Sequence, residues 1–190
     1  MPLQSQTLVI PGPATMTATA TTRHSIQLDL AGEVLRKFGE VRFVARGCSM
    51  IPSIYPGDLL TVRSHHITDA RHGQIVLCLR EGRFWAHRVI RKWQEGNRFL
   101  FTTRGDAHSH EDPSLDEHQL LGRVVSIVRY GKPLDIAQVE NFWTKFVRLG
   151  VRNSSALAKT LLRRHALRLR LLGYSPDLFG PSDAQVLECM

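Results

Sequence analysis

The segment from Val41 to Leu134 does most to limit what this chain can fold into, because it is a succession of short runs typical of β-strands. The runs are rich in β-branched and aromatic residues and are separated by Gly, Asp or Pro. The expected strands are Val41–Arg46, Leu59–Arg63, Gln74–Leu79, Arg83–Lys92, Arg98–Thr103 and Gly122–Tyr130. Arg80-Glu81-Gly82 and Gln94-Glu95-Gly96-Asn97 are expected to be hairpin connections. The pattern predicts a compact, mostly β domain.

Helical patterns lie on both sides of this segment. Asp29 is placed to cap a short helix that Gly39 ends, with one apolar face formed by Leu30, Ala31, Val34, Leu35 and Phe38. After Pro133 a helix is expected that stops at Gly150, with its apolar side at Ile136, Val139, Phe142, Trp143, Phe146 and Val147.

A second C-terminal helix is expected from Ser154 to Leu172 and is rich in Leu and Arg. Its basic side carries Lys159, Arg163 and Arg170, whereas the leucine side is interrupted by Arg164, His165 and Arg168. The domain boundaries expected from these patterns are a disordered leader at 1–24, a β domain at 25–134 and a helical extension at 135–190.

Composition restricts location and partners. The longest strictly apolar run, Ile75 to Leu79, is far shorter than the roughly 20 residues of a transmembrane helix. Met1 to Thr22 has no basic start and contains Pro11 and Pro13, so a secretory signal is not expected. Three cysteines without a CxxC spacing fit a reducing cytoplasm.

The formal charge of +8 is compatible with several anionic partners. Nucleic acid is not favoured, because no recognised reader motif accompanies the charge. The Arg-rich helix is expected to be either a solvated basic helix packed on the β domain or a weak peripheral contact with an anionic membrane.

Three segments carry residues that could do chemistry. Gly47-Cys48-Ser49-Met50-Ile51-Pro52 places a serine directly after a strand, His87 lies in an otherwise apolar strand, and Asp106 and Asp112 lie in a polar loop. A buried imidazole needs a hydrogen-bond partner or a role, and a carboxylate beside it would fix its tautomer. The same loop allows a metal interpretation through His108, His110, Glu111 and Asp112, but these four residues have no established ligand spacing, and solvated loop residues are the default.

Together these segments resemble the signal peptidase I and LexA-like serine peptidases. Gly47 to Pro52, followed by Pro56-Gly57-Asp58, is similar to their nucleophile box. His87-Arg88-Val89-Ile90 resembles the next box of the endoplasmic-reticulum and archaeal signal peptidases, where histidine replaces lysine. Arg104-Gly105-Asp106, with Asp112 after it, is similar to the third box of that branch.

The resemblance implies a coiled, β-barrel-like peptidase domain with flanking helices and a helical C-terminal extension. It implies a serine endopeptidase with Ser49 as nucleophile, His87 as base, Asp112 or Asp106 orienting His87, and Met50 and Pro52 near the substrate. The expected substrate is a peptide or protein, such as a leader segment. The enzyme is expected to need neither a cofactor nor a metal. Signal peptidases of this branch normally have a membrane anchor beside the nucleophile. Because no transmembrane span is expected in this sequence, a soluble substrate is expected.

Two other functions fit the same residues. A peptide-binding or regulatory module of the same fold would have no hydrolytic activity. A self-cleaving, LexA-like regulator would cut within its own N-terminal leader.

Cys48 is expected to pack in the interior, because its side chain should point opposite to Ser49 in an extended segment.

Overall fold

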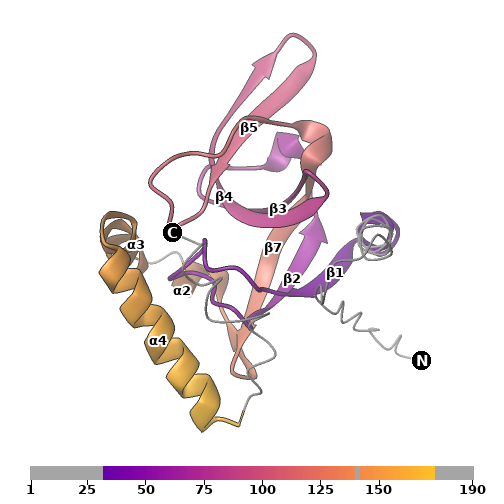
Figure 1. Cartoon of the computed structure of the whole chain (residues 1–190). Helices are drawn as coiled ribbons and strands as arrows, with labels where there is room; N and C mark the ends of the chain where they lie inside the picture. The colour runs from indigo at the N-terminus through magenta and orange to yellow at the C-terminus, as the bar shows by residue number, and fades with distance from the viewer. Residues whose placement is uncertain (1–31, 140–141, 174–190) are drawn as a thin grey trace, which may run out of the picture.

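Within residues 32–139 and 142–173, which the computed structural model describes, eight antiparallel strands form one sheet (Figure 1). The expected leader and the Asp29 cap lie outside these residues. The sheet order is β1-β2-β7-β3-β4-β5-β6, with β8 beside β7. The strands are β1 (Glu40–Val44), β2 (Leu59–Ser64), β3 (Ile75–Arg80), β4 (Arg83–Glu95), β5 (Arg98–Arg104), β6 (Leu115–Asp116), β7 (Leu120–Arg129) and β8 (Lys132–Leu134).

The mostly β fold class is therefore confirmed, with one refinement. The sheet curls, but β1 and β6 remain its edges, so it is not a closed barrel. All six predicted strands are present within three residues of the expected ends. The short strands β6 and β8 were not predicted, because two or three residues carry no readable alternation.

Strand β3 explains the longest apolar run of the sequence. Ile75 and Leu77 belong to one core cluster, while Val76 and Cys78 belong to a second cluster on the other face of the strand. A strand that is covered on both faces reads as a continuous apolar run instead of an alternating one. The curl of the sheet thus creates two cores that share β3.

The two hairpins form where they were expected. Arg80 pairs with Arg83, and Glu81 and Gly82 between them have φ values of 50° and 67°, which suit a two-residue turn with left-handed backbone. Glu95 pairs with Arg98 across Gly96 and Asn97. The β4–β5 hairpin projects beyond the rest of the sheet in Figure 1.

The helices flank this sheet. Residues 32–38 are helical, and Gly39, with a φ of 73°, ends the helix and donates its N–H to Leu35 O at 2.9 Å. Leu35 is buried as predicted, but Phe38 is 70% exposed, so it does not share the packed face. Two 3-10 turns lie between strands of the sheet, η1 (Ile67–Asp69) after β2 and η2 (Glu117–Gln119) after β6. Three α-helices follow β8: α2 (Ile136–Val139), α3 (Phe142–Asn153) and α4 (Ser155–Leu171).

The predicted stop at Gly150 is wrong, because α3 continues to Asn153. A Cβ at Gly150 would lie 2.9 Å from Leu157 Cδ2, so this glycine allows α3 and α4 to approach closely instead of ending the helix. The second helix agrees closely with its prediction: Ser154 is its N-cap and Leu172 its C-cap.

Helix α4 packs on the sheet domain through Leu162, His165 and Leu169, which are buried and recur at spacings of three and four. Leu162 joins Cys48 and Ile51 in a third apolar cluster, directly behind the segment that carries Ser49. In the described residues, no helix is both long enough and apolar enough to cross a bilayer.

Candidate active site

Ser49 lies in a loop that leaves the sheet after β1 and returns at β2. Two backbone hydrogen bonds close the base of this loop, from Ala45 N to Asp58 O and from Gly57 N to Ala45 O, both at 2.8 Å. Gly57 has a φ of 89°, a conformation that side chains with a Cβ rarely adopt. The loop is therefore held in a fixed turn that presents Ser49 beside the sheet.

A buried ion pair anchors the same loop. Asp58 is 1% exposed and accepts a hydrogen bond from Tyr55 N at 2.8 Å. Arg129 of β7 donates to the two oxygens of Asp58 at 2.9 and 2.7 Å and also to Ser53 O at 2.9 Å. The Pro56-Gly57-Asp58 segment thus serves the geometry of the loop and not the chemistry of the site.

His87 of β4 joins the serine to a carboxylate. Its Nε2 lies 3.0 Å from Ser49 Oγ, and its Nδ1 lies 2.6 Å from Asp112 Oδ2. In a neutral imidazole whose Nδ1–H donates to Asp112, Nε2 carries the lone pair that can accept the Ser49 proton. His87 is 2% exposed, and these two contacts orient its ring. Trp85, two residues before His87 on the same strand, is 38% exposed and packs edge-on to the imidazole, with ring centroids 5.5 Å apart.

Asp112 is held by β5 as well as by His87. Thr103 Oγ1 donates to Asp112 Oδ2 at 2.6 Å, and Asp112 N donates to Thr103 O at 2.8 Å. Burial raises the pKa of Asp112, but the hydrogen bond and charge of His87 and the hydrogen bond of Thr103 outweigh it, so the pKa lies below its ordinary value. The carboxylate is ionised at neutral pH and can stabilise an imidazolium.

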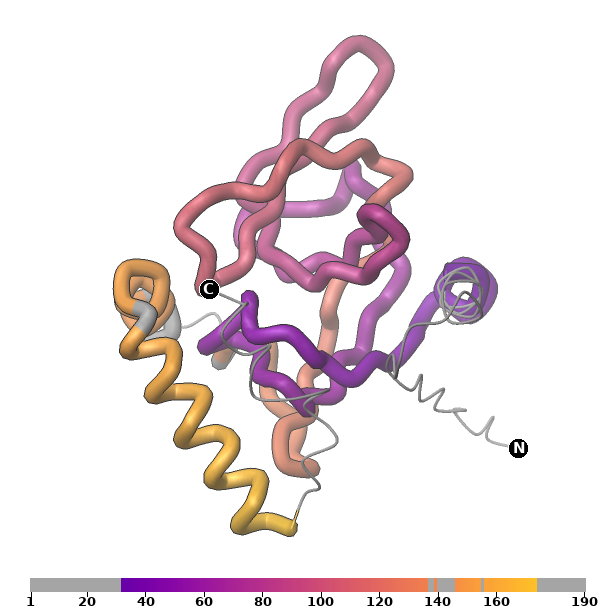
Figure 2. The backbone as a smooth tube through the Cα atoms, viewed as in Figure 1, coloured from indigo at the N-terminus to yellow at the C-terminus, as the bar shows by residue number. Residues whose placement is uncertain are grey.

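The loop after β5 touches the serine loop directly. Ala107 N donates to Ser49 O at 2.8 Å, and a Cβ at Gly105 would lie 2.7 Å from the same oxygen. Figure 2 shows the two segments, far apart in the sequence, side by side. Glycine at 105 is therefore required for the close approach that brings Ser49 and Asp112 to the same imidazole.

Asp106 has a different environment from Asp112. Arg88 Nε and Nη2 each donate to one oxygen of Asp106 at 2.8 Å, Ser53 Oγ donates to it as well, and Arg148 of α3 lies 3.7 Å away. The structure thus places Asp112 against His87 and Asp106 in a buried ion pair behind it. Because His87 and Arg88 are successive residues of one strand, their side chains point to opposite faces.

The two residues expected near the substrate also differ. Met50 is 3% exposed and belongs to the main core cluster, so its side chain is not available to a bound peptide. Pro52 is partly exposed on the serine loop. Cys48 is buried against Ile51 and Leu162, and its packing role is confirmed.

The loop residues considered for a metal have separate partners. Glu111 accepts from Thr102 and lies 3.4 Å from Arg91, while Asp112 faces His87. His108 packs edge-on to His87, with ring centroids 5.6 Å apart. Burial lowers the pKa of His108, and the neighbouring His87 lowers it further, which favours a neutral ring.

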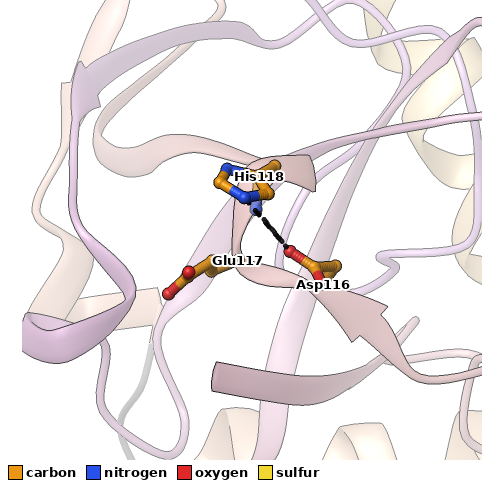
Figure 3. A group of neighbouring side chains, drawn as sticks. All are labelled: Asp116, Glu117 and His118. Atoms are coloured by element: carbon orange, nitrogen blue, oxygen red, sulfur yellow. Dashed lines mark hydrogen bonds and ion pairs between the residues drawn. The ribbon is translucent and has the colours of Figure 1, made fainter. Parts of the chain in front are cut away.

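Among the described residues, potential metal ligands gather instead at Asp116, Glu117 and His118, which Figure 3 draws. Asp116 is the N-cap of η2: its carboxylate accepts from His118 N at 3.1 Å, and Gln119 Oε1 accepts from Asp116 N at 2.9 Å. A capping box accounts for this arrangement without an ion.

The sequence did not reveal the supporting residues Thr103, Arg88 and Arg129. Arg88 gave one indication, because it lies in a largely apolar run, where a charged side chain that is buried needs a partner. Thr103 and Arg129 left none, because their partners are 9 and 71 residues away in the sequence.

A serine hydroxyl, an imidazole and a carboxylate joined in this order form the arrangement found in serine hydrolases. The fold and the comparison with protein families agree with that class: the Peptidase S24-like family matches residues 12–125, and the chain belongs to this family. The family lies in the LexA and signal peptidase superfamily and comprises serine peptidases and self-cleaving proteins. No curated protein matches the chain.

Proposed function

We propose that this protein is a serine endopeptidase in which Ser49, His87 and Asp112 form the catalytic triad. The observation that carries the proposal is the continuous path from Ser49 Oγ through His87 to Asp112, with contacts of 3.0 and 2.6 Å. The use of histidine as the base favours the type of signal peptidase found in the endoplasmic reticulum and archaea over the lysine-dependent type.

In this mechanism His87 Nε2 takes the proton of Ser49 as Oγ forms a bond to the substrate carbonyl carbon. The imidazolium then gives that proton to the leaving amine as the peptide C–N bond breaks, which leaves an acyl group on Ser49. Water, activated by the same imidazole, releases the acyl group and restores the serine. Asp112 holds the tautomer and stabilises the charged ring throughout.

The preferred substrate is a peptide or protein segment in extended conformation, such as a leader. Extended peptides commonly bind by adding a strand to a sheet edge, where main-chain hydrogen bonds supply affinity.

Arg88 and Asp106 take no part in the chemistry here; they hold the loop of Ala107 and Asp112 against the serine loop.

The test is to label the full chain with a serine-directed acylating probe and to measure cleavage of an unbiased peptide library. Ser49→Ala should lose labelling, and Ser49→Ala and His87→Ala should each lower turnover by about 10⁴-fold or more. Ser64→Ala is the matched control, because Ser64 is exposed at the end of β2.

Three results would contradict this proposal or change it. A folded wild-type chain that neither labels nor cleaves would favour a non-catalytic peptide-binding module. Equal activity of wild type and Ser49→Ala would exclude the serine mechanism. Breakage within residues 1–31 at a rate independent of protein concentration would identify a self-cleaving regulator that uses the same triad.

A further inference from the structure

The C-terminal half of α4 has an unusual exposed surface. From Arg163 to Leu172, every exposed residue is an arginine or a leucine. The leucines are Leu167, Leu171 and Leu172, with exposed fractions of 58%, 78% and 56%. A solvated helix on a globular domain would normally show polar residues at these positions.

The two residue types are sorted around the helix. Leu167 and Leu171 lie one turn apart on the side opposite the buried residues Leu162, His165 and Leu169. By helical periodicity, Arg163 and Arg170 lie on one flank of this leucine strip, and Arg164 and Arg168 lie on the other. Figure 1 shows α4 along the margin of the molecule, where this face is not covered by another described element.

The charged side chains of the segment that forms α3 and α4 are all basic. Between Phe142 and Gly173 the sequence contains no Asp or Glu, and its basic residues are Lys145, Arg148, Arg152, Lys159, Arg163, Arg164, Arg168 and Arg170. Phe146 and Leu149 of α3 add further exposed apolar surface. The surface therefore fits a partner that is both anionic and apolar.

We propose that the outer face of α4 binds the surface of an anionic phospholipid bilayer. Leucines between two basic flanks match a helix that lies in the membrane interface, with apolar side chains among the acyl chains and guanidinium groups at the lipid phosphates. A nucleic-acid duplex would use the arginines but would leave Leu167 and Leu171 without a function.

The proposal has a consequence for the candidate active site. The buried face of α4 contacts Cys48 and Ile51, which adjoin Ser49, so only about the width of one helix, roughly 10 Å, separates the serine loop from the proposed membrane face. The surface thereby places the site close to substrates that are themselves at a membrane. Binding itself does not require the chemistry of Ser49.

The experiment is co-sedimentation of the full chain with vesicles of phosphatidylcholine alone and of phosphatidylcholine mixed equally with phosphatidylglycerol. We expect binding to the mixed vesicles only. Arg163→Gln combined with Arg170→Gln should weaken the partition coefficient by about 30-fold, since each basic residue near an anionic surface contributes about fivefold. Leu167→Ser combined with Leu171→Ser should weaken it by about tenfold or more.

Arg42→Gln combined with Arg98→Gln is the matched control, because both residues are exposed on the sheet and the change in net charge is the same. Ser49→Ala should bind as the wild type does, which separates this test from that of the peptidase. Circular dichroism of every variant checks that α4 remains folded.

The proposal would be overturned by absence of binding to the mixed vesicles, or by an equal loss in the sheet control. It would also be overturned if the Leu167→Ser and Leu171→Ser variant bound as the wild type did. Binding of a short DNA duplex that resists the leucine substitutions but follows the arginine substitutions would assign the surface to nucleic acid instead.

Discussion

Asp106 and Asp112 show how little a spacing says about the role of a carboxylate. Both follow β5 in one loop, and both were candidates to orient His87. In the structure Asp112 forms hydrogen bonds with His87 and Thr103, whereas Asp106 forms them with Arg88 and Ser53. The choice was not readable from the sequence, because it depends on the path of the loop after Gly105.

The two aspartates should respond differently to amidation. Asp112→Asn should lower turnover by about 10⁴-fold, because the amide no longer selects the imidazole tautomer with a free Nε2. Asp106→Asn should instead lower the free energy of unfolding by about 3–5 kcal/mol, because it leaves Arg88 buried without its counter-charge. Turnover and denaturant unfolding, measured on both variants, separate the roles. The opposite assignment of effects would contradict the proposed triad.

Gly105 provides a test of the loop contact. Gly105→Ala should reduce turnover and probe labelling, because the new Cβ would meet Ser49 O at 2.7 Å and Ser49 Cβ at 3.1 Å and so displace one loop from the other. Gly47→Ala is the control in the same serine loop, since a Cβ there meets no atom within 4 Å. Equal activities of the two variants would show that the close approach is not needed.

At the scale of elements, the sequence predicted the long strands, both hairpins and the bounds of α4. These depend on local alternation, turn residues and capping, all of which lie within a few residues of one another. The errors at Gly150 and Phe38 have another cause. Whether a glycine ends a helix or permits a close contact is decided by the neighbouring helix, which no local pattern describes.

The attachment of α4 should be sensitive to pH through His165. His165 Nε2 donates to Pro56 O at 2.8 Å, and its Nδ1 lies 2.6 Å from Tyr130 Oη, an arrangement that suits the neutral ring. Burial lowers the pKa of His165 below its ordinary value. As pH falls below about 6.5, the unfolded chain therefore binds a proton that the folded chain resists, and the free energy of unfolding decreases.

His165→Gln should flatten this dependence, because glutamine can donate to Pro56 and accept from Tyr130 but does not titrate. Unfolding midpoints between pH 5 and 7 for wild type and variant would measure the effect. His65 and His108, whose pKa values burial also lowers, should leave a residual slope of the same sign. An unchanged slope in His165→Gln would show that the α4 contact does not titrate in this range.

For the whole molecule, two buried cysteines report on different parts of the fold. Cys48 lies beneath α4, whereas Cys78 lies in the cluster around Phe101. Burial raises the pKa of the Cys78 thiol, which further protects it from reagents that need a thiolate. The pair can therefore distinguish detachment of α4 from opening of the sheet.

In a Cys189→Ser background, both thiols should react slowly with a thiol reagent in the folded state. Leu162→Ala should accelerate the reaction of Cys48 without changing that of Cys78, because it weakens only the contact between α4 and the serine loop. Mass spectrometry of the labelled peptides gives both rates. Equal acceleration at the two sites would mean that α4 and the sheet open as one cooperative unit.

The projecting β4–β5 hairpin gives this protein a convenient place for engineering. Its tip at Gly96 and Asn97 is exposed, and it lies at the far end of β4 from His87. Exposed tips of this kind tolerate inserted peptides, since the added chain displaces no packed residue. A fluorophore or an affinity peptide placed there could follow or immobilise the molecule while leaving the serine loop and α4 accessible.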